Sequence, residues 1–469
     1  MKKMLMALSL SGALLGGSAL VWAEDAASTP VTEHAVAVDT TTASTDIVAA
    51  EAPAPVEATP APAAEATIDT GDTAWVLVST ALVLLMTIPG LALFYGGMVR
   101  KKNVLSTMMF SLSAAILVSL IWVTVGYSLA FSGSGAYVGD LAKAMLNGVA
   151  FDALTGTIPE SLFVIFQMTF AIITVAIISG SIADRMKYSA FMAFIAVWVI
   201  LVYAPITHWV WAADGWLFKK GALDFAGGTV VHINAGVAGL VAAYMLGKRT
   251  GLGRESMAPH NLTLTVIGAS LIWVGWFGFN GGSALGAGAR AGMAILVTQV
   301  AAAAAAFSWL IVERVIRGKA SVLGGASGAV AGLVVITPAA GFVGVGGALI
   351  MGLIGGVVCF WGITALKRLL KADDALDAFG LHAVGGIVGA ILTGIFYSDE
   401  IIKAANVALA PTFAGQLWVQ IEGVLATIAY SAIVTFIILK VIDLVIGIRV
   451  SADDERMGLD LSQHGERIE

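Results

Sequence analysis

Two stretches of the sequence decide the fold: residues 224–239 read DFAGGTVVHINAGVAG, and residues 374–389 read DALDAFGLHAVGGIVG. Both fit the pattern Asp-x7-His-x3-Gly-x2-Gly, with the histidines at His232 and His382. Each stretch opens an apolar segment long enough to span a membrane, and the second segment comes five such segments after the first. Because five is odd, the second copy crosses the membrane in the opposite direction. The pattern therefore predicts an inverted repeat, in which functional sites gather near the midplane between the two halves.

The depth of the two histidines follows from helix geometry. At about 1.5 Å per residue, each histidine lies roughly 12 Å along its helix from the aspartate that opens the pattern. Asp224 starts at one face of the membrane and Asp374 at the other, so His232 and His382 should converge near the centre. Ionisable side chains within a membrane are costly and usually line a pathway. We therefore interpret the two histidines as a pair that lines a pore for a small polar solute.

The composition is typical of a membrane protein. Apolar residues make up 58% of the 469 residues, charged residues only 12%, and the mean hydropathy is +0.91. A water-soluble domain carries about 25% charged residues, so this apolar surface needs lipid as its solvent. The 54 glycines suit helices that pack closely in a bilayer. The sequence has no basic patch for nucleic acid, and its single cysteine, Cys359, excludes a disulfide framework.

Apolar stretches of spanning length recur between short polar breaks. Their centres lie near residues 85, 117, 171, 198, 238, 271, 301, 329, 354, 390 and 432. This spacing predicts an all-α membrane protein with eleven transmembrane helices, arranged as two inverted five-helix halves (spans 1–5 and 6–10) and an eleventh helix. The break between the eighth and ninth centres, at Thr337–Gly341, contains no charged residue.

Lysine and arginine are divided unequally between the two sets of alternate loops. One set holds fourteen: Arg100, Lys101, Lys102, Arg185, Lys187, Lys248, Arg249, Arg254, Arg314, Arg317, Lys319, Lys367, Arg368 and Lys371. The other set holds five: Lys143, Lys219, Lys220, Arg290 and Lys403. The positive-inside rule puts the first set in the cytoplasm. We therefore expect a multi-pass protein of the cell inner membrane, with its N-terminus outside and its C-terminus inside.

The ends of the chain differ from its apolar middle. Residues 1–23 combine a basic start, an apolar run and a plausible cleavage site, which is typical of a secretory signal peptide; an uncleaved anchor is the alternative. Residues 24–70 are rich in Ala, Pro, Thr and acidic residues, and we expect a disordered extracytoplasmic tether. Residues 71–449 then form the membrane domain, and the polar residues 450–469 form a soluble cytoplasmic tail.

The remaining polar residues near the membrane allow simpler interpretations. Asp374 is expected to cap its helix, whereas Asp224 either caps its helix or attracts a cation at the outer mouth. We interpret His208, at the outer end of the fourth span, as an interfacial residue. The spans of His232 and His382 offer no further Cys, His or carboxylate mid-membrane, so we expect neither a metal site nor a cofactor.

Several motifs resemble the ammonium transporter family (Amt/MEP/Rh), in particular its bacterial Amt type. The segments that carry the resemblance are Gly90–Arg100 (GLALFYGGMVR), Asp224–Asn234 (DFAGGTVVHIN), Gly275–Ser283 (GWFGFNGGS), Pro338–Gly344 (PAAGFVG) and Phe379–His382 (FGLH). The resemblance runs from about residue 71 to the C-terminus, and the tail segments Gly458–Asp460 and His464–Glu466 fit it as well.

The resemblance implies a homotrimer in which each subunit holds its own pore for ammonium or ammonia, and for methylammonium. The site residues that it implies are Phe170, Trp211, Ser283 and Asp224 at an outer ammonium site, Phe170 and Phe279 as a stacked gate beneath it, and His232 and His382 as hydrogen-bonded pore histidines. It also implies that trimeric PII signalling proteins can dock on the cytoplasmic face.

These residue types suit the implied chemistry. A cation over an aromatic face recovers roughly 0.5–2 kcal/mol per contact. A serine hydroxyl can accept an N–H bond, which potassium cannot donate. Deeper in, an apolar pore disfavours charge, so we expect ammonium to lose its proton on passage. Neutral imidazoles can then pass a proton or hydrogen-bond ammonia.

Three alternatives remain beside this prediction. A Rhesus-type channel for ammonia or carbon dioxide shares the fold and the histidine pair, but Trp211 and Ser283 at the outer mouth argue against it, because the resemblance associates these two residues with ammonium recruitment. An ammonium sensor would signal through the tail, although no catalytic, kinase or receiver domain follows Val450. A membrane-embedded enzyme would need a nucleophile, a base and an orienting group together, and no such grouping accompanies the Asp and His residues. We therefore expect a transporter and not an enzyme.

Overall fold

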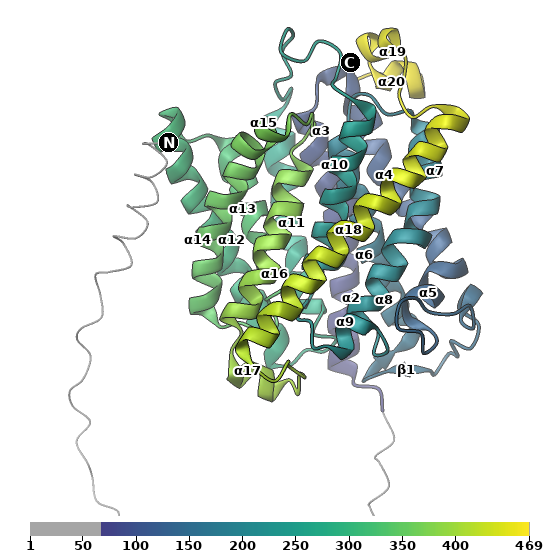
Figure 1. Cartoon of the computed structure of the whole chain (residues 1–469), viewed down its shortest axis with the longest axis vertical. Helices are drawn as coiled ribbons and strands as arrows, with labels where there is room; N and C mark the ends of the chain where they lie inside the picture. Colours follow the sequence, from purple (N-terminus) through teal and green to yellow (C-terminus); the bar gives the residue numbers. More distant parts are fainter. Residues whose placement is uncertain (1–66, 469) are drawn as a thin grey trace, which may run out of the picture. The chain divides into compact units, whose positions relative to one another are not determined.

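The computed structural model describes residues 67–468, which form a bundle of long helices between two faces (Figure 1). We call the face that carries α19 (Ala452–Met457) and α20 (Leu459–His464) the tail face. The opposite face carries the start of the described chain and the two-stranded hairpin of β1 (Leu154–Thr155) and β2 (Ile158–Pro159). The predicted signal peptide and nearly all of the predicted tether lie outside the described residues.

Eleven apolar helical segments cross this bundle. Among the described residues, ten are long enough to span a membrane, and an eleventh, α13 (Val322–Ile336), is shorter but also apolar. Each predicted centre falls within one of these segments, so the prediction of an all-α membrane protein with eleven helices is confirmed. The charge-free break at residues 337–341 is part of the turn that follows α13.

The first five spans run from Thr70 to Leu246. Their elements are α2 (Thr70–Leu85), η1 (Met86–Leu91) and α3 (Ala92–Met98); η2 (Lys101–Asn103), α4 (Val104–Ile121), η3 (Trp122–Gly126) and α5 (Tyr127–Phe131); α6 (Glu160–Ile182); α7 (Tyr188–Trp198), η5 (Val199–Tyr203), α8 (Ala204–Trp211) and α9 (Trp216–Lys219); and η6 (Gly228–Ile233) with α10 (Asn234–Leu246). A short turn, η4 (Ala144–Leu146), lies in the loop before β1.

The second half runs from Leu262 to Phe396. Its elements are α11 (Leu262–Gly282); α12 (Ala289–Arg317); α13; α14 (Val345–Trp361), η7 (Gly362–Leu366) and α15 (Lys367–Leu370); and η8 (Phe379–Ala383) with α16 (Val384–Phe396). A short helix, α17 (Asp399–Ala404), precedes the eleventh span, α18 (Phe413–Ile446). In Figure 1, α18 crosses the outside of the bundle obliquely.

Polar side chains set the starts of several spans. Asp69, Asn261, Ser321 and Thr412 stand just before α2, α11, α13 and α18, and the side chain of each accepts a hydrogen bond from the backbone N–H of the third residue of its helix. Such caps satisfy donors that a helix cannot pair internally, which matters most where the helix enters an apolar medium. The apolar runs between these caps therefore begin at defined residues.

The two histidine spans share a local irregularity. His232 lies in η6 and His382 in η8, and both elements are single π-helical turns that continue into an α-helix. The spans just before them, the fourth and the ninth, also contain a π-helical turn each, η5 and η7. Such turns are rare and often mark functional sites. The last two spans of each half therefore match in this irregularity, as an inverted repeat predicts, whereas η1 and η3 in the first two spans have no counterpart in α11 and α12.

The repeated glycines let the two histidine spans cross closely. A Cβ atom on Gly236 would lie 2.7 Å from the Cβ of Ala383, the residue after His382. In the other copy, a Cβ on Gly386 would lie 2.8 Å from the carbonyl oxygen of Gly228. Real Cβ atoms do not approach other heavy atoms this closely. Gly236 and Gly386 occupy the same position of the pattern, four residues after the histidine. Each of them therefore leaves room for the histidine turn of the other copy.

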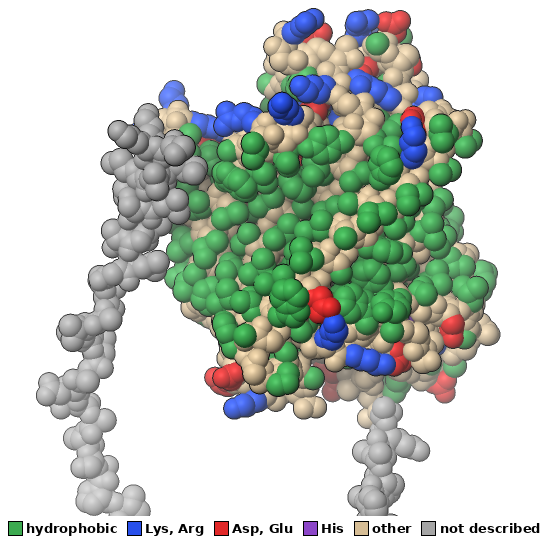
Figure 2. All heavy atoms as spheres, viewed as in Figure 1, with side chains coloured by type: hydrophobic (Ala, Val, Ile, Leu, Met, Phe, Trp, Pro, Cys, Tyr) green, Lys and Arg blue, Asp and Glu red, His purple; other side chains and the backbone are tan. Residues whose placement is uncertain are grey.

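The surface of the described residues is suited to lipid. Figure 2 shows a broad apolar band between two polar ends, with lysine and arginine gathered mostly toward the tail face. Large exposed apolar side chains of the spans α4, α12 and α18 include Leu120, Phe307, Trp418, Leu444 and Val445. A water-soluble protein would not leave so much contiguous apolar surface uncovered. The chain is therefore a multi-pass membrane protein.

The C-terminal tail departs from its prediction. The polar residues 450–469 were expected to be a soluble end, but within them Glu455, Leu459 and Asp460 are buried against the bundle. The backbone N–H of Leu459 donates to Asn103 Oδ1 at 2.8 Å, and Asp460 Oδ1 accepts from the backbone N–H of Ser106 at 2.7 Å. The tail is docked because its carboxylates and amides match groups at the start of α4, which a charge count cannot reveal.

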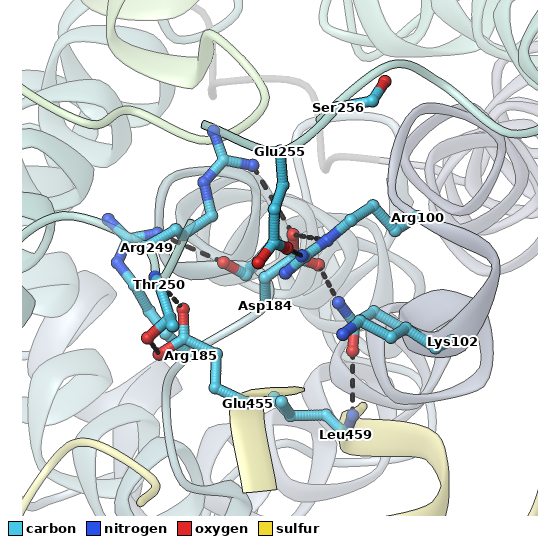
Figure 3. A network of polar contacts seen from close by, with 12 residues as sticks. Arg100, Lys102, Asp184, Arg185, Arg249, Thr250, Glu255, Ser256, Glu455 and Leu459 are labelled. Atoms are coloured by element: carbon cyan, nitrogen blue, oxygen red, sulfur yellow. Dashed lines mark hydrogen bonds and ion pairs between the residues drawn. The ribbon is translucent and has the colours of Figure 1, made fainter. Parts of the chain in front are cut away.

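A network of charges joins the tail to the loops of the tail face (Figure 3). The carboxylate of Glu455 accepts from the backbone N–H and the hydroxyl of Thr250 at 2.6 and 2.9 Å, and from Arg449 at 2.8 Å. Nearby, Asp184 pairs with Arg100 at 3.3 Å and with Arg249 at 3.5 Å. Loops that are far apart in the sequence are thereby held together on one face.

Replacing Glu455 by Gln should release the tail. Burial acts to raise the pKa of Glu455, but hydrogen bonds from Arg449 and Thr250 outweigh it and hold this pKa below its ordinary 4.5. The ionised carboxylate therefore stabilises docking above pH 4.5, and this stabilisation is lost as the pH falls through the lowered pKa. Losing a hydrogen-bonded charge costs about 1.5–3 kcal/mol, so we expect hydrogen exchange in residues 452–464 to accelerate roughly 10- to 150-fold.

Asp453→Asn is the matched control for Glu455→Gln. Among residues 67–468, Asp453 forms one ion pair, with Arg456 at the surface, where the Asp453 side chain is 90% exposed, and such pairs contribute little. Equal protection of the tail in Glu455→Gln and in the control would contradict this account of docking.

Candidate functional site

The two predicted histidines meet in the middle of the bundle. His382 Nδ1 lies 3.2 Å from His232 Nδ1, and the ring planes are inclined by 28° with centroids 5.3 Å apart. His232 is fully buried and His382 is 4% exposed. A hydrogen bond between two Nδ1 atoms needs a proton on one ring and a lone pair on the other. The pair therefore carries one donor and one acceptor at the contact.

The surroundings of His232 are aromatic. Its ring stacks on Trp276 at 5.4 Å and lies 6.1 Å from Phe279. Its Nε2 atom is buried and has no hydrogen-bond partner among residues 67–468. Within the same residues, no three His, Cys, Asp or Glu side chains gather in a way that could hold a metal ion. The open Nε2 therefore offers a polar contact to a solute in an otherwise apolar passage.

A pocket on the face opposite the tail brings the predicted outer-site residues together. Its volume is about 600 Å³, and Phe170, Trp211, Asp224 and Ser283 all line it. The Trp211 ring stands edge-on to Phe170 at 5.7 Å, and its Nε1 donates to the carbonyl oxygen of Asp224 at 2.9 Å. The Ser283 hydroxyl donates to the carbonyl of Phe279 at 2.8 Å. The lone pairs of Ser283 Oγ therefore remain available as acceptors.

The structure favours the capping role of Asp224. Its buried carboxylate accepts from the backbone N–H groups of Gly227, Gly228, Thr229 and Val230 at 2.5–3.2 Å, and from the Thr229 hydroxyl. These are the free donors at the start of η6, so the carboxylate is held by its own helix. The same carboxylate still places a negative charge at the pocket wall.

The second aspartate of the repeat behaves similarly. Asp374 accepts from the backbone N–H of Phe379, the first residue of η8, at 2.9 Å, and from the Ser181 hydroxyl at 2.7 Å. Asp374 therefore caps its helix, as predicted.

Two stacked phenylalanines separate the pocket from the histidines. The rings of Phe170 and Phe279 lie 4.3 Å apart and 25° from parallel. Phe170 lines the pocket, and Phe279 contacts the His232 ring on the other side of the stack. Beyond His382, a very small cavity is lined by apolar side chains such as Ile173 and Val330. The residues therefore form a row from pocket to stack to histidines to apolar cavity.

Sequence reasoning missed two side chains of this row. Trp276 precedes Phe279 by three residues, so both point to the same face of α11, and this spacing could have indicated it. Gln167 lines the pocket with an Oε1 atom that is buried and unpaired among the described residues. Nothing in its sequence context distinguishes Gln167, because only the tertiary structure turns α6 toward the pocket.

The interpretation of His208 as an interfacial residue is wrong. His208 is fully buried, and its two ring nitrogens lie 3.0 Å from the carbonyl of Ala130 and 2.5 Å from that of Gly135. The residue ties α8 to the loop after α5, because a turn of that loop folds over the end of the span.

Together, the eleven-span bundle and the row of aromatic and imidazole side chains define a membrane transporter for a small solute. Known proteins identify this transporter further. The sequence profile of the Ammonium Transporter Family matches residues 74–468. The ammonium transporter of Bacillus subtilis (strain 168) is 52% identical over 399 residues, which cover 85% of this chain and 98% of that protein. Ammonium transporter Amt1 of Archaeoglobus fulgidus is 46% identical, covering 84% and 98%.

Solved structures agree with the sequence relatives. Saccharomyces cerevisiae Mep2 matches with a TM-score of 0.76 at 37% identity, over 82% of this chain and 88% of that one. A structure described as a sensor Amt protein matches with a TM-score of 0.78 at 30% identity, over 84% and 98%. The chain belongs to the ammonium transporter family, and it moves ammonium or ammonia across a membrane.

Proposed function

We propose that ammonium enters through the pocket lined by Phe170, Trp211 and Ser283. The aromatic faces offer cation–π attraction, and Ser283 Oγ and Gln167 Oε1 offer acceptors for two N–H groups. Potassium has a similar size but no N–H, so acceptors fixed at these positions favour ammonium. The Asp224 carboxylate adds a negative charge to the pocket wall without leaving its helix.

We further propose that ammonium gives up one proton at the phenylalanine stack and continues as ammonia, while the proton crosses by way of the His232–His382 imidazoles, so that one positive charge moves with each ammonia. Ammonium would lose its hydration in the apolar passage beyond Phe170 and Phe279, and removing a charged group from water costs much free energy. Neutral ammonia would lose its hydration there at a much lower cost. The His232–His382 pair then supplies a donor and an acceptor to a solute that has both. One observation carries this proposal. The imidazole rings of His232 and His382 are in direct contact, and the passage around them has apolar walls.

The decisive experiment measures transport by the wild-type protein in reconstituted vesicles. Uptake of labelled methylammonium and an ammonium-evoked current should both appear, should saturate, and should exceed any response to potassium. Vesicles without protein give the background. Wild-type vesicles with no ammonium-dependent flux would overturn the proposed pathway.

Replacing Ser283 by Ala should weaken ammonium binding. Removing an acceptor for a charged donor costs about 1.5–3 kcal/mol, so we expect the half-saturating ammonium concentration to rise roughly tenfold or more. Ser283→Thr retains the hydroxyl and should stay close to wild type. An equal change in both variants would indicate that packing, and not the hydroxyl, governs binding.

For orientation, we propose a periplasmic N-terminus, a cytoplasmic C-terminus and a location in the cell inner membrane. Residues 1–23 would act as the signal peptide, residues 24–70 as an extracytoplasmic tether and residues 450–469 as a cytoplasmic tail. The excess of lysine and arginine in one set of loops supports this orientation. A fluorescent protein fused after Glu469 should fluoresce, whereas alkaline phosphatase at the same position should be inactive; the reverse result would contradict it.

We propose that three copies assemble and that a PII protein docks on the tail face. The resemblance of the motifs supports both parts, and the network of Figure 3 holds the loops of that face in a defined shape. The mass of the purified particle tests the trimer, and a mass of one or two chains would exclude it. Retention of a purified PII protein on vesicles tests the docking.

A further inference from the structure

Arg290 is an unexpected cation at the mouth of a cation pocket. It is the second residue of α12 and lines the same pocket as Trp211, Asp224 and Ser283. No carboxylate within residues 67–468 forms an ion pair with it. The acid that lines the pocket, Asp224, accepts hydrogen bonds from backbone N–H groups. The pocket wall therefore carries the negative charge of Asp224 and the positive charge of Arg290 without an ion pair between them, and the charge of Arg290 acts on a solute separately.

The side chain of Arg290 is held in place by aromatic rings. Its guanidinium carbon lies 4.8 Å from the centroid of Phe225 and 5.0 Å from that of Phe342, and these rings meet edge-on at 5.6 Å. Its Nε donates to the carbonyl of Gly341 at 3.1 Å. A Cβ on Gly341 would lie within 2.5 Å of the Phe225 ring, so only glycine admits this packing. The charge is therefore fixed in position and not a mobile surface group.

Local helix stability does not explain this position. The first turn of α12 contains no acidic residue, and the N-terminus of a helix disfavours a cation. The two rings that hold Arg290 are also groups that could themselves attract an entering cation. Arg290 occupies their faces, so these two rings are not open to a solute in the way that Trp211 and Phe170 are.

We propose that Arg290 is a specificity-determining residue that weakens cation binding in the pocket and excludes divalent cations. This inference rests on the proposed function of the pocket. A pocket of about 600 Å³ is roughly 10 Å across. Two unit charges roughly 8 Å apart repel enough to shift an equilibrium about 2- to 30-fold, depending on the local dielectric. The repulsion is twice as large for a divalent cation, so the fold-change is squared.

As a consequence, the pocket selects ammonium among cations by its aromatic and hydrogen-bond contacts and not by its positive charge. A fixed positive charge lowers the occupancy of every cation, but ammonium recovers binding through aromatic and hydrogen-bond contacts that other cations make less well. Magnesium and calcium are repelled most strongly, and they therefore do not block the entrance. Low occupancy also favours rapid release of the solute into the pore.

Two variants separate the charge of Arg290 from its packing. Arg290→Met keeps an apolar side chain against Phe225 and Phe342 but removes the charge, and Arg290→Lys keeps the charge. In reconstituted vesicles at low salt, we expect Arg290→Met to lower the half-saturating ammonium concentration about 2- to 30-fold. Millimolar magnesium should then inhibit its current. Arg290→Lys should behave like wild type in both respects.

Salt dependence gives a further readout. The screening length falls to about 3 Å at 1 M salt, so the difference between Arg290→Met and wild type should shrink as monovalent salt is added. An unchanged half-saturating concentration in Arg290→Met would overturn the inference, as would an equal change in Arg290→Lys. If Ser283→Ala changes the half-saturating ammonium concentration but Arg290→Met does not, ammonium binding in the pocket is supported and only the proposed role of Arg290 is wrong. If neither variant shifts it, the proposed pocket fails.

Discussion

Vesicles that carry the double variant His232→Ala, His382→Ala should lose the preference of the transporter for ammonium over potassium. The substitution removes the only imidazoles at the centre of the row and leaves a void between Trp276 and the apolar cavity beyond His382. A polar solute in this passage would lack partners, which costs about 1–3 kcal/mol for each missing hydrogen bond and corresponds to roughly 5- to 150-fold in rate. We therefore expect the ratio of ammonium-evoked to potassium-evoked current to fall by at least about fivefold.

The single variants and a control make this result interpretable. Each ring holds the other through the contact between Nδ1 atoms, so either single substitution should produce most of the effect. His260→Ala removes a histidine from the loop before α11 and should transport like wild type. A double variant with unchanged flux and selectivity would remove the histidines from the mechanism.

The second large effect concerns a glycine that touches no solute. In Gly386→Ala, the added Cβ would lie 2.8 Å from the carbonyl oxygen of Gly228 and 3.1 Å from the Cβ of His232. The contacted carbonyl belongs to a helix backbone and cannot rotate away, so the two histidine spans must separate. Overpacking of this kind costs about 1–3 kcal/mol. We expect a lower midpoint of thermal unfolding in detergent and a loss of ammonium current that resembles the histidine variants.

Gly346→Ala is the matched control for Gly386→Ala. Gly346 lies in α14, is exposed, and a Cβ there would meet no heavy atom within 4 Å. Alanine is a better helix former than glycine by about 1 kcal/mol, so this variant should be at least as stable as wild type. If Gly386→Ala were as stable and as active as the control, the close crossing would not be needed.

Much of the fold could be predicted from local sequence because a membrane imposes a simple rule. Backbone groups in lipid must be paired within the segment, so every long apolar run becomes a helix. All eleven centres were found in this way, including the short α13 that follows a charged loop. The pattern shared by residues 224–239 and 374–389 also indicated that the two histidines meet, because equal spacing from opposite faces leads to equal depth.

Other features depended on contacts between segments that are distant in the sequence. A charge count treated the tail as solvated, yet Glu455 and Asp460 find partners at Thr250 and Ser106. His208 was assigned to the interface from its position at the end of a span, but the loop that covers it comes from a different part of the chain. No local sequence pattern predicts the docking of the tail or the burial of His208, because both depend on which loops fold over which helix ends.

The sequence by itself determined the number of spans, the inverted repeat and the depth of His232 and His382, because hydropathy and helix rise act along one segment. Only the tertiary structure decided which side chains face one another: the Phe170–Phe279 stack, the capping of η6 by Asp224, and the charge of Arg290 at the pocket. The physical reason is that spacing along a helix sets depth, whereas rotation and crossing of helices are set by packing. In this protein, glycines such as Gly386 decide that packing.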